Sequence, residues 1–121
     1  MRYDSTITIE STAVEGVRFT IARMTFGRRI ELMRRVRQLS AQMEFEKAGS
    51  HVTDQIQASL LGAEIDELYL KWGLVAIEGL EVDGGTATAE TVVSLGPERL
   101  CHEIIVTIKR ECSLTDEERK N

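Results

Sequence analysis

Apolar and polar residues alternate in two short runs near the N-terminus. The apolar members are Ile7 and Ile9 in the first run and Val17, Phe19 and Ile21 in the second. Such alternation places the apolar side chains on one face of a β-strand. Glu15 and Gly16, which lie between the two runs, form a turn signal. We therefore expect residues 1–23 to fold as a β-hairpin with one apolar face.

After this hairpin, apolar residues recur every three or four positions, which is the period of an α-helix. Thr25 can cap a first long helix that continues to about Lys47 and ends at the sequence Ala48-Gly49-Ser50. A second helix is expected to begin at residue 53 or 54 and to end between residues 73 and 79. The predicted apolar stripes are Phe26, Ile30, Met33, Val36, Leu39 and Met43 on the first helix, and Leu61, Ile65, Leu68, Trp72 and Val75 on the second.

The last third of the chain contains clear turn and helix-ending signals. Residues 75–82 predict a short strand before the Asp83-Gly84-Gly85 turn, and residues 88–95 predict a short helix that Gly96 ends. Pro97 suits the first position of a closing helix that continues to about Glu111. This helix is expected to bury Leu100, Cys101, Ile104, Ile105, Ile108 and Cys112. Thr115 and Glu118 have the spacing of a capping box, which predicts that another helical turn begins in the tail.

These elements predict an α+β fold in a single domain over residues 1–121. It consists of a β-hairpin (residues 1–23), a mainly helical body of three to four helices (24–112) and a C-terminal tail (113–121). The chain length, 42% hydrophobic residues and 29% charged residues are typical of one globular domain. The apolar stretches are far shorter than a bilayer span, and no signal peptide is recognisable, so we expect a cytoplasmic protein that does not associate with membranes.

Charge is distributed unevenly along the chain. Residues 1–40 contain eight basic and four acidic residues, a net +4, whereas residues 41–121 contain seven basic and sixteen acidic residues, a net −9. One interpretation is that opposite ends of neighbouring copies attract each other, which favours a homo-oligomer. The other interpretation is that the two segments pair within one chain.

The residue types that carry out chemistry do not form a recognisable site. Cys101 and Cys112 fall about three turns apart on one predicted helix, so they cannot form a disulfide with each other. With His51 and His102 they have no zinc-ligand spacing, and no nucleophile or phosphate-binding motif is present. The acidic groups around residues 64–67 and 78–83 are best explained as solvated surface. We therefore expect neither an enzyme nor a bound cofactor or metal.

The first long helix carries five arginines, which is the one feature that favours nucleic acid. Only Phe26 among the six aromatic residues lies in this helix's arginine-rich part, and the acidic pI of 5.1 also argues against nucleic-acid binding. An acidic protein partner, including another copy of the chain, explains the arginines better. The candidate interaction residues are Arg28, Arg29, Met33, Arg34, Arg35, Met43, Leu68 and Trp72, and for the apolar members the sequence leaves open whether they belong to the core or to an interface.

Four short motifs in the second half of the chain resemble a known family. They are residues 69–74 (YLKWGL), 77–84 (IEGLEVDG), 96–98 (GPE) followed by Leu100, Glu103, Ile104 and Ile108, and 114–121 (LTDEERKN). This set is similar to the tail assembly chaperones of long-tailed bacteriophages and prophages, which commonly show a Trp-containing helix, a turn with Gly, Leu and Asp-Gly, and a closing helix. The resemblance covers the C-terminal half to two-thirds of the chain.

The resemblance implies a non-enzymatic helper in phage tail morphogenesis. Copies of such a chaperone bind the tape-measure protein in the host cytoplasm, keep its apolar helices soluble and recruit tail-tube subunits. The resemblance carries over no catalytic residue. The predicted N-terminal hairpin departs from the smaller, mostly helical members of the family, which leaves a structural component of the virion's tail or neck as an alternative.

Overall fold

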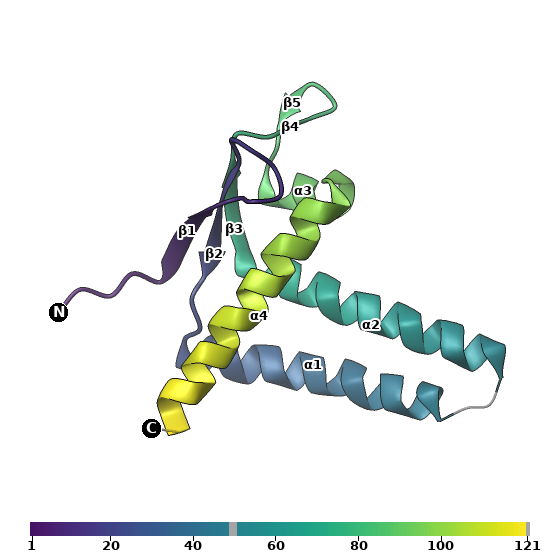
Figure 1. The fold of residues 1–121 in the computed structure, drawn as a ribbon. Coiled ribbons are helices and arrows are strands. Elements are labelled where there is room, and N and C mark those ends of the chain that lie inside the picture. The colour runs from purple at the N-terminus through teal and green to yellow at the C-terminus, as the bar shows by residue number, and fades with distance from the viewer. Residues whose placement is uncertain (49–50, 121) are drawn as a thin grey trace.

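The computed structural model describes the backbone of residues 1–48 and 51–120, and the side chains of these residues except 46 and 113–120. The elements are β1 (Thr6–Glu10), β2 (Arg18–Ala22), α1 (Phe26–Lys47), α2 (Val52–Gly73), β3 (Leu74–Glu78), β4 (Glu81–Val82), β5 (Gly85–Thr86), α3 (Ala89–Leu95) and α4 (Glu98–Lys120). Figure 1 shows two regions. The sheet β1-β2-β3 with β4, β5, α3 and α4 forms what we call the body, and α1 and α2 form an arm that projects from it.

The predicted N-terminal hairpin is confirmed, and it is part of a larger antiparallel sheet. β2 lies in the centre, with β1 on one side and β3, from the middle of the chain, on the other. In this register Thr20 lies between Thr8 and Ala76, and Phe19 lies between Ile9 and Ile77. The alternation therefore places Ile9, Phe19 and Ile77 on one face, which is the face that contacts the core.

The predicted strand over residues 75–82 is only partly correct. β3 ends at Glu78, and Val82 belongs to the separate hairpin of β4 and β5. The interruption follows from Gly79, whose φ of +83° lies in the left-handed region. The predicted turn at Asp83 and Gly84 joins β4 to β5, and both residues have positive φ, as a tight Asp-Gly hairpin requires.

The core of the body lies where α4 crosses the sheet (Figure 1). Leu100, Ile104 and Ile108 on α4 are fully buried, as predicted, whereas Ile105, Cys101 and Cys112 are half-buried. The C-terminal end of α2 approaches α4 closely at Gly73, where an added Cβ would lie 2.6 Å from Ile108 Cδ1. The buried members of this core are Val17, Phe19, Ile21, Leu70, Leu74, Ile77, Ala87, Val92, Leu100, Ile104 and Ile108.

Helix ends agree with the sequence signals in part. The side chain of Thr25 accepts a hydrogen bond from the backbone N–H of Arg28 (3.3 Å), and Thr88 caps α3 in the same way. α2 begins at Val52, slightly earlier than expected, and residues 49–50 of the predicted stop lie outside the described residues. The predicted end of the closing helix at Glu111 is wrong. α4 continues to Lys120 because no glycine or proline interrupts it, so the expected new helix in the tail is part of α4.

The arm is an antiparallel helix pair with a small interior of its own. Leu32, Ala58 and Leu61 are buried, although they do not belong to the core of the body. Half-buried Val36, Leu39 and Met43 extend this interior along α1. The residues of the predicted stripe on α1 divide between two environments, because Phe26, Ile30 and Met33 are exposed, whereas Leu32, which the stripe omitted, is buried. A step of three residues turns only about 300° around a helix, so a stripe built from repeated steps of three drifts off one face.

Candidate functional site

The cysteines and histidines do not assemble a reactive centre in the described part of the chain. Cys101 and Cys112 are not joined by a disulfide. The Cys101 thiol donates a hydrogen bond to the carbonyl oxygen of Val92 (3.3 Å), and burial raises its pKa, which keeps it protonated and weakly nucleophilic. His51 precedes α2 at the far end of the arm, whereas His102 lies on α4. No group of three potential metal ligands occurs among the described residues. None of the described helices is long and apolar enough to span a bilayer.

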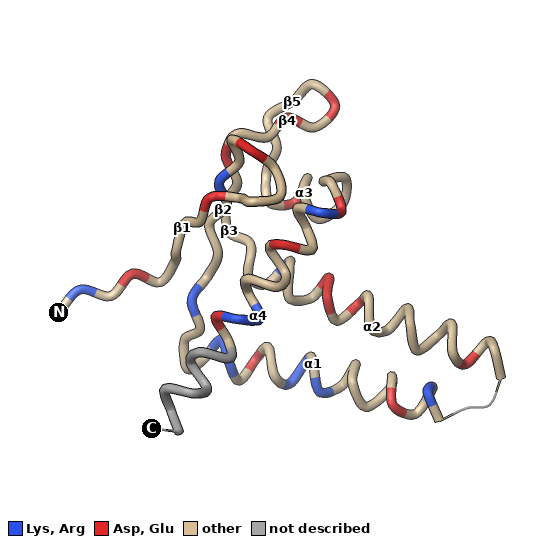
Figure 2. The backbone as a smooth tube through the Cα atoms, viewed as in Figure 1, with Lys and Arg blue, Asp and Glu red and all other residues tan. Residues whose placement is uncertain are grey.

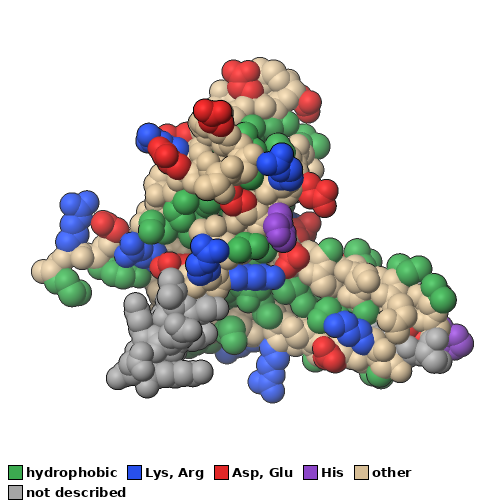
Figure 3. All heavy atoms as spheres, in the orientation of Figure 1, with side chains coloured by type: hydrophobic (Ala, Val, Ile, Leu, Met, Phe, Trp, Pro, Cys, Tyr) green, Lys and Arg blue, Asp and Glu red, His purple; other side chains and the backbone are tan. Residues whose placement is uncertain are grey.

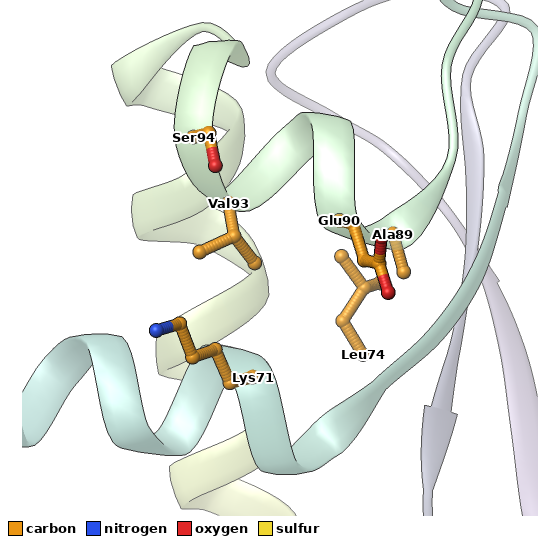
Figure 4. Close-up of a pocket in the computed structure, with 6 residues that line it drawn as sticks. All are labelled: Lys71, Leu74, Ala89, Glu90, Val93 and Ser94. Carbon is orange, nitrogen blue, oxygen red and sulfur yellow. The ribbon is translucent and has the colours of Figure 1, made fainter.

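The cavity between α3 and the end of α2 has a volume of about 510 Å³ (Figure 4). Leu74, Ala89 and Val93 form its apolar part, and Lys71 and Glu90 are its charged groups. Figure 4 shows Lys71 and Val93 on opposite sides of the opening. The Lys71 amine already forms an ion pair with Glu67 (3.1 Å) on the preceding turn of α2. These groups provide neither a nucleophile with a base nor a metal-ligand set.

Glu103 is the most extensively hydrogen-bonded carboxylate among the described residues, and it binds the loop between β1 and β2. It accepts hydrogen bonds from Ser11 Oγ (2.5 Å), from the backbone N–H of Thr12 (2.7 Å) and from Thr12 Oγ1 (2.7 Å). Burial on its own raises the pKa of this carboxyl, but the hydrogen bonds outweigh that effect and lower it. Arg99 supports the same loop by donating to the carbonyl oxygen of Ala13 (3.2 Å). This cluster holds the hairpin on α4, which is a structural role.

The arm carries exposed apolar side chains that packing within the chain does not explain. Seven of the twelve exposed large hydrophobic side chains in the described part of the chain lie on α1 and α2. Figure 3 shows apolar side chains on the outside of the arm as well as between its helices. We call Phe26, Ile30 and Met33 the α1 stripe and Val52, Ile56 and Leu60 the α2 stripe. Their exposed fractions range from 45% for Ile30 to 75% for Val52, and Phe45 is the seventh residue, at 78%.

The α1 stripe borders a shallow groove along the outer surface of α1. Ile30, Met33 and half-buried Val36 supply its apolar walls, and Arg34 and Arg37 supply positive charge. Its volume is about 570 Å³. Spacings of three and four residues place all these side chains on neighbouring turns of one helix face. An apolar groove bordered by guanidinium groups suits an amphipathic helix that carries acidic residues.

The structure places the eight candidate interaction residues in three different environments. Met33 and Arg34 lie in the outer groove of α1. Met43 packs inside the arm, where its Sδ lies 3.6 Å from the Cβ position of Gly62, and Leu68 and Trp72 are half-buried, Trp72 against the core of the body. Arg28 lies over the Trp72 ring (5.2 Å to its centroid), Arg35 pairs with Glu31 (3.2 Å), and Arg29 is half-buried. Met33 and Arg34 are exposed in the groove, Arg28 and Arg35 are exposed but already engaged within the chain, and the other four residues are half-buried.

The arginines of α1 do not form one basic face. Arg34 and Arg37 line the outer groove, whereas Arg28 is held on Trp72 and Arg35 on Glu31. At about 100° per residue, Arg28 and Arg35 share a side of α1 from which Arg34 and Arg37 point away. Figure 2 shows basic positions along α1 interrupted by acidic ones. A continuous phosphate-binding strip is therefore not favoured by this arrangement.

The α2 stripe was not predicted from the sequence. Its members are spaced by four residues, which is a helical period, but the interior positions Leu61 and Ile65 lie beside it and dominate the pattern. A helix that shows two apolar faces has more than one packing surface, and that is the signal that could have identified it.

No protein-family model, curated protein or solved structure matches this chain.

Proposed function

We propose that this protein is a non-enzymatic binding protein that covers an apolar helix of a partner with its arm. The observation that supports this proposal is the concentration of exposed apolar side chains on α1 and α2, which carry seven of the twelve in the described part of the chain. Contiguous exposed apolar surface is a mark of interaction sites, because its contact with water is unfavourable. The exposed methionine in the groove, Met33, adds a flexible side chain that adapts to different partners.

The sequence resemblance suggests the identity of that partner. A tail assembly chaperone binds the tape-measure protein, a long helical chain whose apolar stripe needs to be covered until tail-tube subunits enclose it. On this proposal the protein acts in the host-cell cytoplasm during tail morphogenesis. The arm meets the physical requirement, since its outer groove combines apolar walls with Arg34 and Arg37 and accepts a helix whose flanks are acidic.

Co-expression with the tape-measure protein tests the proposal. We expect the wild-type chain to increase the soluble fraction of the tape-measure protein, and Met33→Asp to remove most of this effect. Gln38→Glu, on another side of α1, adds a negative charge outside the groove and is the matched control. An unchanged soluble fraction with the wild-type chain would contradict the proposal. Recovery of the chain in purified virions would instead support the alternative, a structural component of the tail or neck.

A further inference from the structure

The α1 stripe and the α2 stripe lie at opposite ends of the arm. The α1 stripe occupies the first turns of α1, next to the body, and the α2 stripe occupies the first turns of α2, next to the connection at the far end (Figure 1). Both stripes are apolar and exposed, and both follow helical spacing. Within one chain they do not meet, so each requires a surface from another molecule to leave water.

The two helices of the arm carry opposite charge. α1 has six basic and three acidic residues, a net +3, and α2 has one basic and four acidic residues, a net −3. Arg2–Asp4, Arg18–Glu10 and Arg35–Glu31 are ion pairs within the basic segment 1–40, and Lys71–Glu67 and Lys109–Asp66 are ion pairs within the acidic segment 41–121. Arg37 on α1 and Glu64 on α2 are exposed and form no ion pair with any described residue. Contact between α1 of one molecule and α2 of another is therefore favoured over contact between like helices.

We propose that two copies of this chain form a symmetric dimer through their arms, with α1 of each copy packed along α2 of the other. If the arms lie antiparallel, the far end of one arm meets the body end of the other, and a two-fold axis repeats the same contact twice. In this arrangement α1 and the partner's α2 run parallel. Both stripes of both copies are then covered.

The spacing of the residues supports this register. When α1 of one copy is aligned with α2 of the other at a difference of 26 in residue number, Phe26 lies opposite Val52 and Ile30 opposite Ile56. One turn further along, a difference of 27 places Met33 opposite Leu60. The same difference of 27 brings Arg37 opposite Glu64. Three apolar pairs are thus followed by one pair of opposite charges, at positions three or four residues apart on α1 and four residues apart on α2. This dimer is independent of client binding, because the purified chain alone is enough to test for it. If a client helix also binds the α1 groove, it competes with the second copy.

The first test is the mass of the purified full-length chain in solution, measured by light scattering over a range of concentrations. We expect a dimer of twice the 13.6 kDa chain mass. Ile30→Asp and Ile56→Asp each place a charge in the stripe and are expected to raise the dimer dissociation constant at least about tenfold. Gln38→Glu, outside both stripes, should leave the dissociation constant unchanged. Far-UV circular dichroism verifies that each variant is folded.

Charge exchange gives the sharper test. Arg37→Glu and Glu64→Arg are each expected to weaken the dimer about two- to fivefold, and the double variant is expected to recover most of the loss, because both symmetric contacts then regain opposite charges. A monomeric wild-type chain at all concentrations would overturn the proposal. An effect of Ile30→Asp without an effect of Ile56→Asp would also overturn it, because contact between two α1 helices would explain that result. So would a double variant that dimerises no more tightly than the single variants. A larger assembly would overturn the two-fold closure.

Discussion

The body and the arm use similar apolar residues in opposite ways. In the body, eleven buried side chains form one core, although Val75, Leu95 and Val106 remain exposed. In the arm, Leu32, Ala58 and Leu61 are buried, while seven large apolar side chains remain exposed. The body therefore buries a larger apolar core than the arm, and the arm exposes more apolar side chains, which is typical of an interaction surface.

The largest expected effect is in the core of the body. Ile104→Ala should lower the free energy of unfolding by about 2–5 kcal/mol, because it leaves a cavity at a fully buried position on α4. Val106→Ala removes atoms from an exposed position on the same helix and should change it by less than about 0.5 kcal/mol. Urea denaturation followed by the fluorescence of Trp72, the single tryptophan, measures both. Equal losses would contradict the placement of the core.

A second large effect is expected at Gly79, where β3 ends. Its φ is +83°, and a Cβ at this position would overlap the carbonyl oxygen of Gly16. Gly79→Ala should therefore cost at least about 1–3 kcal/mol. Gly85 is the matched control, since its nearest neighbour would lie at an ordinary 3.8 Å from an added Cβ. If Gly79→Ala and Gly85→Ala unfold at the same urea concentration, the close approach of the two loops is incorrect.

Removal of the Glu103 charge should have a smaller, pH-dependent effect. The hydrogen bonds from Ser11 and Thr12 outweigh the effect of burial and lower its pKa below the ordinary value of a glutamate, so the ionised carboxylate stabilises the fold above the pKa of the unfolded chain. That stabilisation is lost as the pH falls through the lowered pKa. Glu103→Gln should lose about 1–2 kcal/mol at pH 7 relative to wild type, and the difference should shrink toward pH 3.

Unfolding measured from pH 7 to pH 3 tests this prediction, with Glu98→Gln as the control. Glu98 is exposed on the first turn of the same helix. A difference between wild type and Glu103→Gln that stays constant over this range would show that the carboxylate's ionisation does not matter. The result would then have to be explained by packing.

The sequence predicted the elements of the fold better than the contacts between them. Alternation in β1 and β2 and the caps at Thr25 and Thr88 act over a few residues, so they are visible locally. The pairing of β2 with β3 joins residues more than fifty positions apart, and local pattern contains no information about it. The same limit applies to the carboxylate of Glu103, whose partners Ser11 and Thr12 lie about ninety positions away.

The sequence could not separate the candidate interaction residues by their environment, for a related reason. Met33 and Arg34 were selected from the sequence and lie in the outer groove. Trp72, selected with them, packs against the core of the body, and Leu68 is half-buried. Composition and spacing show that a helix has apolar residues. Which of these face a partner depends on where the neighbouring helix lies, and that is a tertiary property.

The smallest expected effect on stability belongs to the outer surface of the arm. Leu60 and Leu61 are adjacent on α2 and identical in type, but 50% of Leu60 is exposed and only 2% of Leu61. At a concentration where the chain is monomeric, Leu61→Ala should cost about 2–5 kcal/mol, whereas Leu60→Ala should cost less than about 0.5 kcal/mol. At higher concentration Leu60→Ala should also lose the dimer. Equal stability losses in the monomer would mean that Leu60 already packs within its own chain, and the α2 stripe would then not be the exposed surface that the dimer requires.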